Sequence, residues 1–129
     1  MKKRSVPKPT KAELEILQIL WGSGPSTVRF INDKMNQKKD VGYTTTLKIM
    51  QIMVEKNLLT RDEKNKSHIY SAVYKRDETQ KVLLDKFLES AFGGSASRLV
   101  MQALGNRKTS KREIEEIRNF LDKIEGGKR

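Results

Sequence analysis

The chain has 129 residues, of which 36% are hydrophobic and 33% are charged, which fits either one domain of average size or one small globular domain with an appendage. It contains no cysteine and one histidine, so disulfides and thiolate metal sites are excluded and no metal or other cofactor is expected. The net charge of +11 at pH 7 is typical of a protein that binds a polyanion.

Residues 1–9 carry four basic residues and two prolines, and they are interpreted as a flexible basic arm. No apolar stretch follows them, which argues against a signal peptide. No apolar run in the chain approaches the length that spans a membrane, so no direct membrane insertion is expected. These features predict a soluble, cytoplasmic protein.

The sequence carries signals for the beginning, the apolar face and the end of a first predicted helix. Thr10-Lys-Ala-Glu13 is a capping-box pattern, which begins a helix. Gly22-Ser-Gly-Pro25 ends it. Trp21 closes the apolar stripe, so core packing is preferred over stacking on a base. The residues of that stripe are Leu14, Ile16, Leu17, Ile19, Leu20 and Trp21.

Two further helices are expected before residue 58. Ser26 is expected to cap a helix over residues 26–37, and residues 38–42 form a polar turn. A third helix is predicted over residues 44–56, closed by Asn57 in a left-handed conformation. The side chains expected to point inward from these two helices are Val28, Ile31, Met35, Met50 and Met53.

Two short strands are predicted at residues 58–61 and 69–73, joined by the polar loop 62–67. Three helices followed by a hairpin are the pattern of a winged helix-turn-helix. The chain is therefore predicted to be mainly α, with a winged-helix DNA-binding domain over residues 10–75.

Residues 76–125 are predicted to form a helical dimerisation region. One helix covers residues 77–92 and ends at a glycine pair, and Ser95 is expected to cap a shorter one. Ser110-Lys-Arg-Glu113 is a second capping box that opens the last helix. Residues 126–129 are expected to be a disordered tail.

The apolar faces of these C-terminal helices exceed what a monomer of this size could easily cover. A symmetric dimer is the simplest way to bury them. The alternative is that they fold back onto the chain's own winged helix. The side chains predicted at the dimer interface are Phe87, Phe92, Leu99, Ile117, Leu121 and Ile124.

Five short segments and one tyrosine form a pattern in chain order: Leu14–Trp21, Tyr43–Thr46, Glu55–Leu59, Tyr70, Phe92–Gly94 and Ser110–Ile117. Together they resemble the penicillinase repressor family, over about residues 8–125. The resemblance implies a dimeric repressor on a palindromic operator, with a winged helix that reads DNA and C-terminal helices that interlock between protomers. In its antibiotic-responsive members, a membrane sensor with a metalloprotease domain triggers cleavage of the dimer arm.

The chain departs from its relatives at two points. The copper-responsive members carry paired Cys-x-Cys motifs, and this chain has no cysteine, so Cu(I) sensing by that route is excluded. The cleaved members have an Asn-Phe pair where this chain has Gln102-Ala103. These two residues are the expected cleavage region if the switch is proteolytic. A sensor metalloprotease or no protease at all both stay open.

The DNA contacts are expected at the start of the third helix and in the hairpin. A helix N-terminus reaches base edges, and threonine methyls pack on thymine methyls. Alternatively, Thr44–Thr46 only begin a helix, and the hairpin charges, partly neutralised by Asp62-Glu63, are solvated. The residues predicted to contact DNA are Tyr43, Thr44, Thr45, Lys48, Arg61, Lys64 and Lys66.

Charge distribution supports a nucleic-acid partner for the front half. Residues 1–75 hold 15 Lys and Arg against 7 Asp and Glu, a net of +8. The leading hypothesis is a sequence-specific repressor that binds double-stranded DNA as a homodimer. The alternative is a non-specific nucleic-acid-binding or packaging protein. An enzyme is not expected, because one histidine and no cysteine leave little from which to assemble a nucleophile and base.

Overall fold

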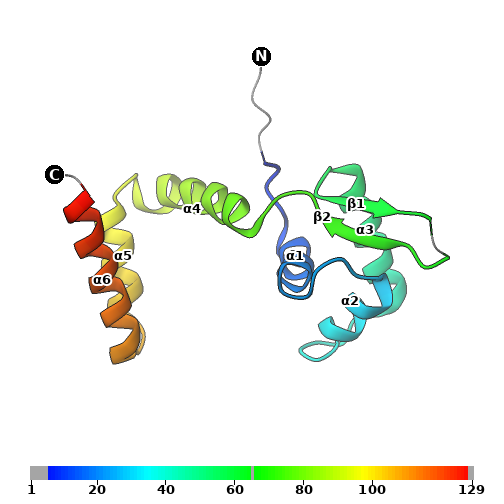
Figure 1. The fold of residues 1–129 in the computed structure, drawn as a ribbon, viewed down its shortest axis with the longest axis horizontal. Coiled ribbons are helices and arrows are strands. Elements are labelled where there is room, and N and C mark those ends of the chain that lie inside the picture. Colours follow the sequence, from blue (N-terminus) through cyan, green and yellow to red (C-terminus); the bar gives the residue numbers. More distant parts are fainter. Residues whose placement is uncertain (1–5, 65, 128–129) are drawn as a thin grey trace, which may run out of the picture. The chain divides into compact units, whose positions relative to one another are not determined.

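The computed structural model describes residues 6–64 and 66–127 and divides into two units, residues 1–85 and 86–129 (Figure 1). Within the described residues, no helix is long and apolar enough to cross a membrane. The order of elements confirms the predicted mainly α fold with a winged helix. The elements are α1 (Lys11–Ser23), α2 (Val28–Met35), α3 (Tyr43–Glu55), β1 (Leu59–Asp62), β2 (Ile69–Ala72), α4 (Arg76–Phe92), α5 (Ala96–Gly105) and α6 (Lys111–Gly127).

The capping box predicted for α1 is present in full. Thr10 Oγ1 accepts a hydrogen bond from the Glu13 N–H at 3.2 Å, and the Thr10 N–H donates to Glu13 Oε1 at 2.9 Å. At the other end, the Gly24 N–H donates to the Leu20 carbonyl at 2.7 Å. Gly24 has a φ of 84°, which a residue with a side chain rarely adopts, so glycine suits this helix end.

The cap predicted for α2 is wrong by one residue. Thr27, not Ser26, caps the helix, and its hydroxyl oxygen accepts the N–H of Phe30 at 3.1 Å. The Ser26 backbone instead pairs with Tyr70 in a short antiparallel bridge, with N···O distances of 3.0 and 2.8 Å. This pairing holds Ser26 extended, so the helix starts later. It also ends earlier than predicted, at Met35.

The hydrophobic core of the described residues lies among α1, α2, α3 and the hairpin. Met50 and Met53 are fully buried, which confirms their predicted role as core fillers. Trp21 packs against the core, and its indole N–H donates to the Tyr74 carbonyl at 3.1 Å. The buried apolar side chains are Ile16, Leu17, Leu20, Val28, Ile31, Met35, Met50, Met53, Leu58, Leu59 and Tyr70.

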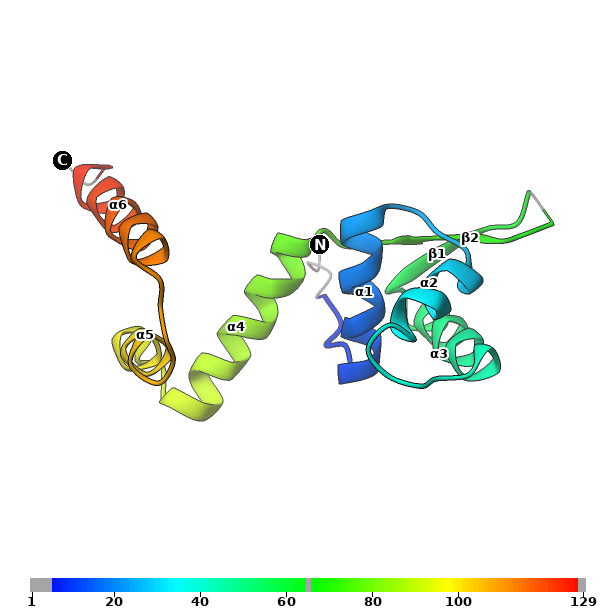
Figure 2. The same ribbon diagram turned by 90° about the horizontal axis from the view of Figure 1, so that it is seen from below.

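The hairpin follows α3 directly. Asn57 takes the predicted left-handed conformation, with a φ of 64°, and turns the chain into β1. The strands pair antiparallel from Leu59 opposite Ala72 to Asp62 opposite Ile69. Figure 2 shows this hairpin beside α2 and α3, with its loop extending past both helices, as the wing of a winged helix does.

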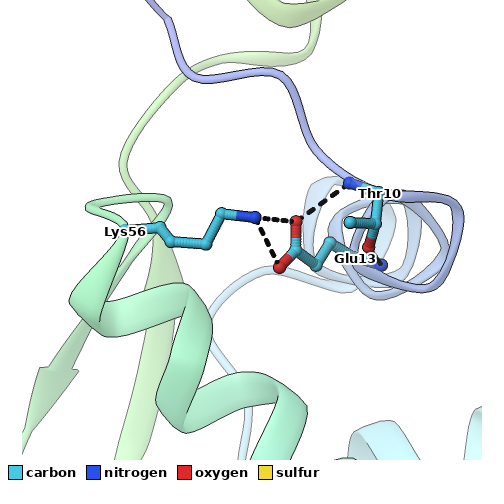
Figure 3. Close-up of polar contacts among 3 residues, drawn as sticks. All are labelled: Thr10, Glu13 and Lys56. Atoms are coloured by element: carbon cyan, nitrogen blue, oxygen red, sulfur yellow. Dashed lines mark hydrogen bonds and ion pairs between the residues drawn. The ribbon is translucent and has the colours of Figure 1, made fainter.

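A partly buried ion pair joins the start of α1 to the residue that follows α3 (Figure 3). Lys56 Nζ lies 2.8 and 2.9 Å from the two carboxylate oxygens of Glu13, whose exposed fraction is only 4%. The same carboxylate also accepts the Thr10 N–H. One acidic side chain therefore caps α1 and fixes that helix against α3.

Replacing Glu13 by Ala is expected to destabilise the folded chain by roughly 2 kcal/mol, because it removes half of the capping box and leaves Lys56 without its partner. Urea unfolding followed by far-UV circular dichroism measures the change. Glu55→Ala is the matched control on an exposed site of α3, and it should shift stability by less than about 0.5 kcal/mol. Equal losses in both variants would contradict a structural role for the ion pair.

Glycines end α4 as the sequence predicts. Gly93 and Gly94 have φ values of 57° and 86°, in the left-handed region that stops a helix. Ser95 then caps α5, with its hydroxyl oxygen accepting the Arg98 N–H at 3.3 Å. The sequence therefore located the break between these two helices correctly.

The last helix begins where predicted and runs further than predicted. Ser110 Oγ accepts the Glu113 N–H at 3.0 Å, and the Glu113 carboxylate lies 3.8 Å from Arg107 in an ion pair. α6 continues through Gly127, although the sequence suggested a tail from residue 126. Residues 1–5 of the expected basic arm and residues 128–129 lie outside the described residues.

Candidate nucleic-acid interface

One face of α3 is exposed at the residues predicted to contact DNA. The side chains of Thr44, Thr45 and Lys48 are exposed, and the exposed fraction of Tyr43 is 42%. Ile52, one turn beyond Lys48, extends the same face and is 40% exposed, although sequence reasoning placed it in neither the core nor the site. The outer face of α3 thus presents hydroxyl, ammonium and apolar groups, which suit the edges of bases.

Thr46 does not share this exposed face. It is fully buried, and its hydroxyl oxygen accepts a hydrogen bond from Asn32 Nδ2 at 2.7 Å. Asn32 Nδ2 also donates to the Val41 carbonyl at 3.1 Å, and Asn36 pairs with both backbone groups of Val41. These amides tie α2 to the turn before α3. The spacing of Thr46 from Met50, four residues, could have placed it on the core side.

Thr46→Val should destabilise the chain by about 1–2 kcal/mol, because the Asn32 amide loses a buried acceptor while the side-chain volume is kept. The expected fall in Tm is roughly 5–10 °C, read by thermal unfolding. Thr44→Val is the matched control, since the same change at an exposed site should leave Tm nearly unchanged. A Tm in Thr46→Val equal to that of the control would show that the hydrogen bond between Asn32 and Thr46 does not stabilise the fold.

A groove of about 330 Å³ lies between the start of α2, the start of α3 and the hairpin loop. The Arg29 guanidinium sits over the Tyr43 ring, 5.2 Å from its centroid, at this groove. Sequence reasoning selected neither Arg29 nor His68, because only the fold brings these segments together. The residues of the groove that carry donors or apolar contact area include Thr27, Arg29, Tyr43, Leu47, Lys66, Ser67 and His68.

The predicted cations of the hairpin differ in their surroundings. Arg61 is held by Glu63, whose carboxylate accepts from the guanidinium Nε at 2.9 Å. Hydrogen bonding with the Tyr70 side chain, and then with Glu63, raises the pKa of Arg61 above its ordinary value, so Arg61 stays cationic. Lys64 and Lys66 are exposed, but only Lys66 lines the groove. The acidic pair therefore offsets part of the wing's charge, as the sequence suggests.

The C-terminal unit buries none of its apolar side chains fully. No side chain between residues 86 and 126 is buried. The exposed fractions of Phe87, Leu121 and Ile124, three residues predicted at a dimer interface, are 54%, 55% and 41%. The other three predicted interface residues, Phe92, Leu99 and Ile117, are half-buried. Exposed apolar side chains that the prediction did not include are Val100, Met101 and Phe120.

The expected cleavage region lies inside a helix. Gln102 and Ala103 belong to α5 (Ala96–Gly105), and both side chains are exposed. Over the parts of the chain that are described, no group of three or more His, Asp and Glu side chains is arranged to hold a metal ion.

Comparison with known proteins places both units in one sequence family. A family model described as penicillinase repressor matches residues 9–123. The chain is 26% identical over 113 residues to the penicillinase repressor of Staphylococcus aureus, covering 88% of this chain and 90% of that protein. It is 25% identical over 117 residues to the transcriptional regulator BlaI of Mycobacterium tuberculosis, covering 89% and 83%. It is 24% identical over 114 residues to the methicillin resistance regulatory protein MecI of Staphylococcus aureus, covering 88% and 93%.

Proposed function

Because the match extends over residues 9–123, the chain belongs to the penicillinase repressor family of transcriptional repressors, and we propose that it acts as a homodimer on a palindromic operator. Membership confirms the predicted DNA-binding repressor and the expectation that the chain is not an enzyme. The observation that carries the proposal is the exposed face of α3 beside a groove with basic side chains.

In the proposed complex, α3 lies in the major groove with its N-terminal end toward the bases. Thr44, Thr45 and Lys48 meet base edges, where threonine methyls contact thymine and the Lys48 ammonium binds guanine acceptors. Tyr43 contacts the sugar–phosphate backbone. The wing residues Arg61, Lys64 and Lys66 bind flanking phosphates, which position the protein without reading sequence.

The proposed dimer is formed by the C-terminal unit. Its uncovered apolar side chains support this, because a second copy would remove them from water. A two-fold dimer presents two α3 helices to two half-sites of opposite orientation, which accounts for a palindromic operator. The side chains assigned to the interface are Phe87, Phe92, Leu99, Ile117, Leu121 and Ile124.

A gel-shift titration against the promoter of the chain's own operon tests this function. We expect binding to that promoter at least about 1,000-fold tighter than to random DNA of the same length, in the range of specific regulators. Equal affinity for both would favour the alternative function, a non-specific nucleic-acid-binding or packaging protein. That alternative is supported by the net charge of +11.

Release of the repressor is proposed to occur by cleavage in the arm, triggered by a sensor metalloprotease. Cutting between Gln102 and Ala103 would separate α6 from the rest of the chain and remove part of the dimer interface. Since proteases bind extended chains, α5 must open first. Within one chain no side chain of α5 is buried, and in the proposed dimer Leu99 must leave the interface for α5 to open. An immunoblot after induction checks this step, and repressor that stays full-length in induced cells would contradict it.

A further inference from the structure

The groove between α2, α3 and the hairpin loop gathers positive charge from segments far apart in the sequence. Arg29 comes from the first turn of α2, and Lys66 comes from the loop before β2. The Arg29 guanidinium carbon lies over the Tyr43 ring, and this cation–π contact does not use the N–H donors of the guanidinium, which can bind an anion. None of the described residues that line the groove is acidic.

The two walls of the groove are tied together by backbone pairing. The Ser26 N–H donates to the Tyr70 carbonyl at 3.0 Å, and the Tyr70 N–H donates to the Ser26 carbonyl at 2.8 Å. Ser26 lies three residues before Arg29, and His68 lies two residues before Tyr70. The segments that carry Arg29 and His68 are therefore joined by a hydrogen-bonded bridge, and both side chains line the same groove.

We propose that this groove binds one backbone phosphate of the operator, with Arg29 and His68 as ligands beside Lys66, and that protonation of His68 strengthens the binding. The inference rests on the proposed function, because the phosphate belongs to the DNA that α3 reads. It adds two ligands that the sequence did not indicate, and it adds a dependence of DNA affinity on pH.

The direction of this dependence follows from the charges around the imidazole. Histidine is the side chain that ordinarily changes charge between pH 5 and 8. The groups that line the groove with His68 are the Arg29 and Lys66 cations, the phenols of Tyr43 and Tyr70, the hydroxyls of Thr27 and Ser67, and the apolar side chains of Val28 and Leu47. A bound phosphate supplies the negative charge that this set lacks, so the complex favours the charged imidazole more than the free protein does. Affinity for DNA therefore rises as pH falls.

Fluorescence anisotropy with the full chain and an operator duplex, at pH 6.0 and pH 8.0 and constant ionic strength, tests the proposal. The unsubstituted protein should bind roughly three- to tenfold tighter per protomer at pH 6.0, the gain expected from one charge-assisted hydrogen bond. His68→Gln should abolish most of this difference. His68→Arg should bind tightly at both pH values, which a merely structural role for His68 would not produce.

The salt dependence of DNA affinity measures the contribution of Arg29 separately from that of His68. Arg29→Gln should weaken binding at both pH values and reduce the slope of log affinity against log salt by about one per protomer. Lys11→Gln removes an exposed charge on α1 outside the groove and serves as the matched control, with a smaller change in slope expected.

Three outcomes would overturn the inference. One is an unchanged pH dependence in His68→Gln. Another is an Arg29→Gln slope equal to that of Lys11→Gln. The third is that inorganic phosphate raises the Tm of the chain while neither substitution alters DNA affinity, which would mean that the groove binds a free anion and not the DNA backbone. Failure of the proposed function looks different, because operator and random duplex would then bind equally at every pH.

Discussion

Replacing Leu121 by Glu is expected to convert the protein into a monomer in solution and to lower its affinity for operator DNA by roughly 100- to 10,000-fold. Leu121 is 55% exposed on α6, in an apolar row with Ile117 and Ile124. In the proposed dimer this row is buried, so a carboxylate there would cost roughly 3–5 kcal/mol of dimerisation free energy. Without dimerisation, each protomer binds its half-site independently. The affinity gained when two linked protomers bind together is then lost.

Sedimentation equilibrium measures the mass, and a gel-shift titration measures the affinity. Asn119→Glu is the matched control, because it introduces the same side chain two residues away on the polar side of α6. This control should remain a dimer with nearly unchanged DNA affinity. If Leu121→Glu dimerises like the control, the apolar row of α6 is not the dimer interface. Far-UV circular dichroism of both variants checks that their helices are intact.

Replacing Thr45 and Lys48 together by Ala should remove the preference for operator over shuffled DNA while leaving the fold intact. Both side chains are exposed on α3, and a good base contact contributes roughly 1–3 kcal/mol of discrimination. The double variant should therefore lose at least about 30-fold in operator affinity and only a few-fold for shuffled DNA. Its Tm should stay unchanged, in contrast to Thr46→Val.

Fluorescence anisotropy with an operator and a shuffled duplex of equal length separates the two effects. Lys81→Ala, at an exposed site of α4, controls for the loss of one positive charge. This substitution should lower the affinity for both duplexes equally, and only slightly. If the Thr45 and Lys48 variant loses affinity equally for both duplexes, α3 contacts only the DNA backbone. That result would favour the non-specific alternative.

Local signals predicted most of the fold. The capping box at Thr10, the left-handed Asn57 and the glycine pair after α4 each depend on neighbours within a few residues, and the structure has each of them. Ser26 was assigned wrongly because its backbone pairs with Tyr70, a contact 44 residues away that no local pattern reveals. The backbone pairing of Ser26 with Tyr70 outweighs the preference of serine for the first capping position of a helix.

The candidate site was predictable only in part for the same reason. Their position at the start of the third helix predicted that Thr44, Thr45 and Lys48 face DNA, and all three side chains are exposed. The burial of Thr46 depends on its hydrogen bond with Asn32, and the groove depends on α2 meeting the hairpin loop. Arg29 and His68 are 39 residues apart, so their common position is a property of the fold and not of either segment.

Selection of binding sites from random duplex DNA tests the central claim most directly, since it asks for specificity and two-fold symmetry together. The full chain would be incubated with a random library, and the bound fraction would be sequenced after several rounds. We expect enrichment of two copies of one half-site in inverted orientation, with their centres separated by one turn of DNA, about 10 base pairs, or a multiple of it. No enriched sequence, or a single half-site without an inverted partner, would contradict a dimeric repressor that reads a palindrome.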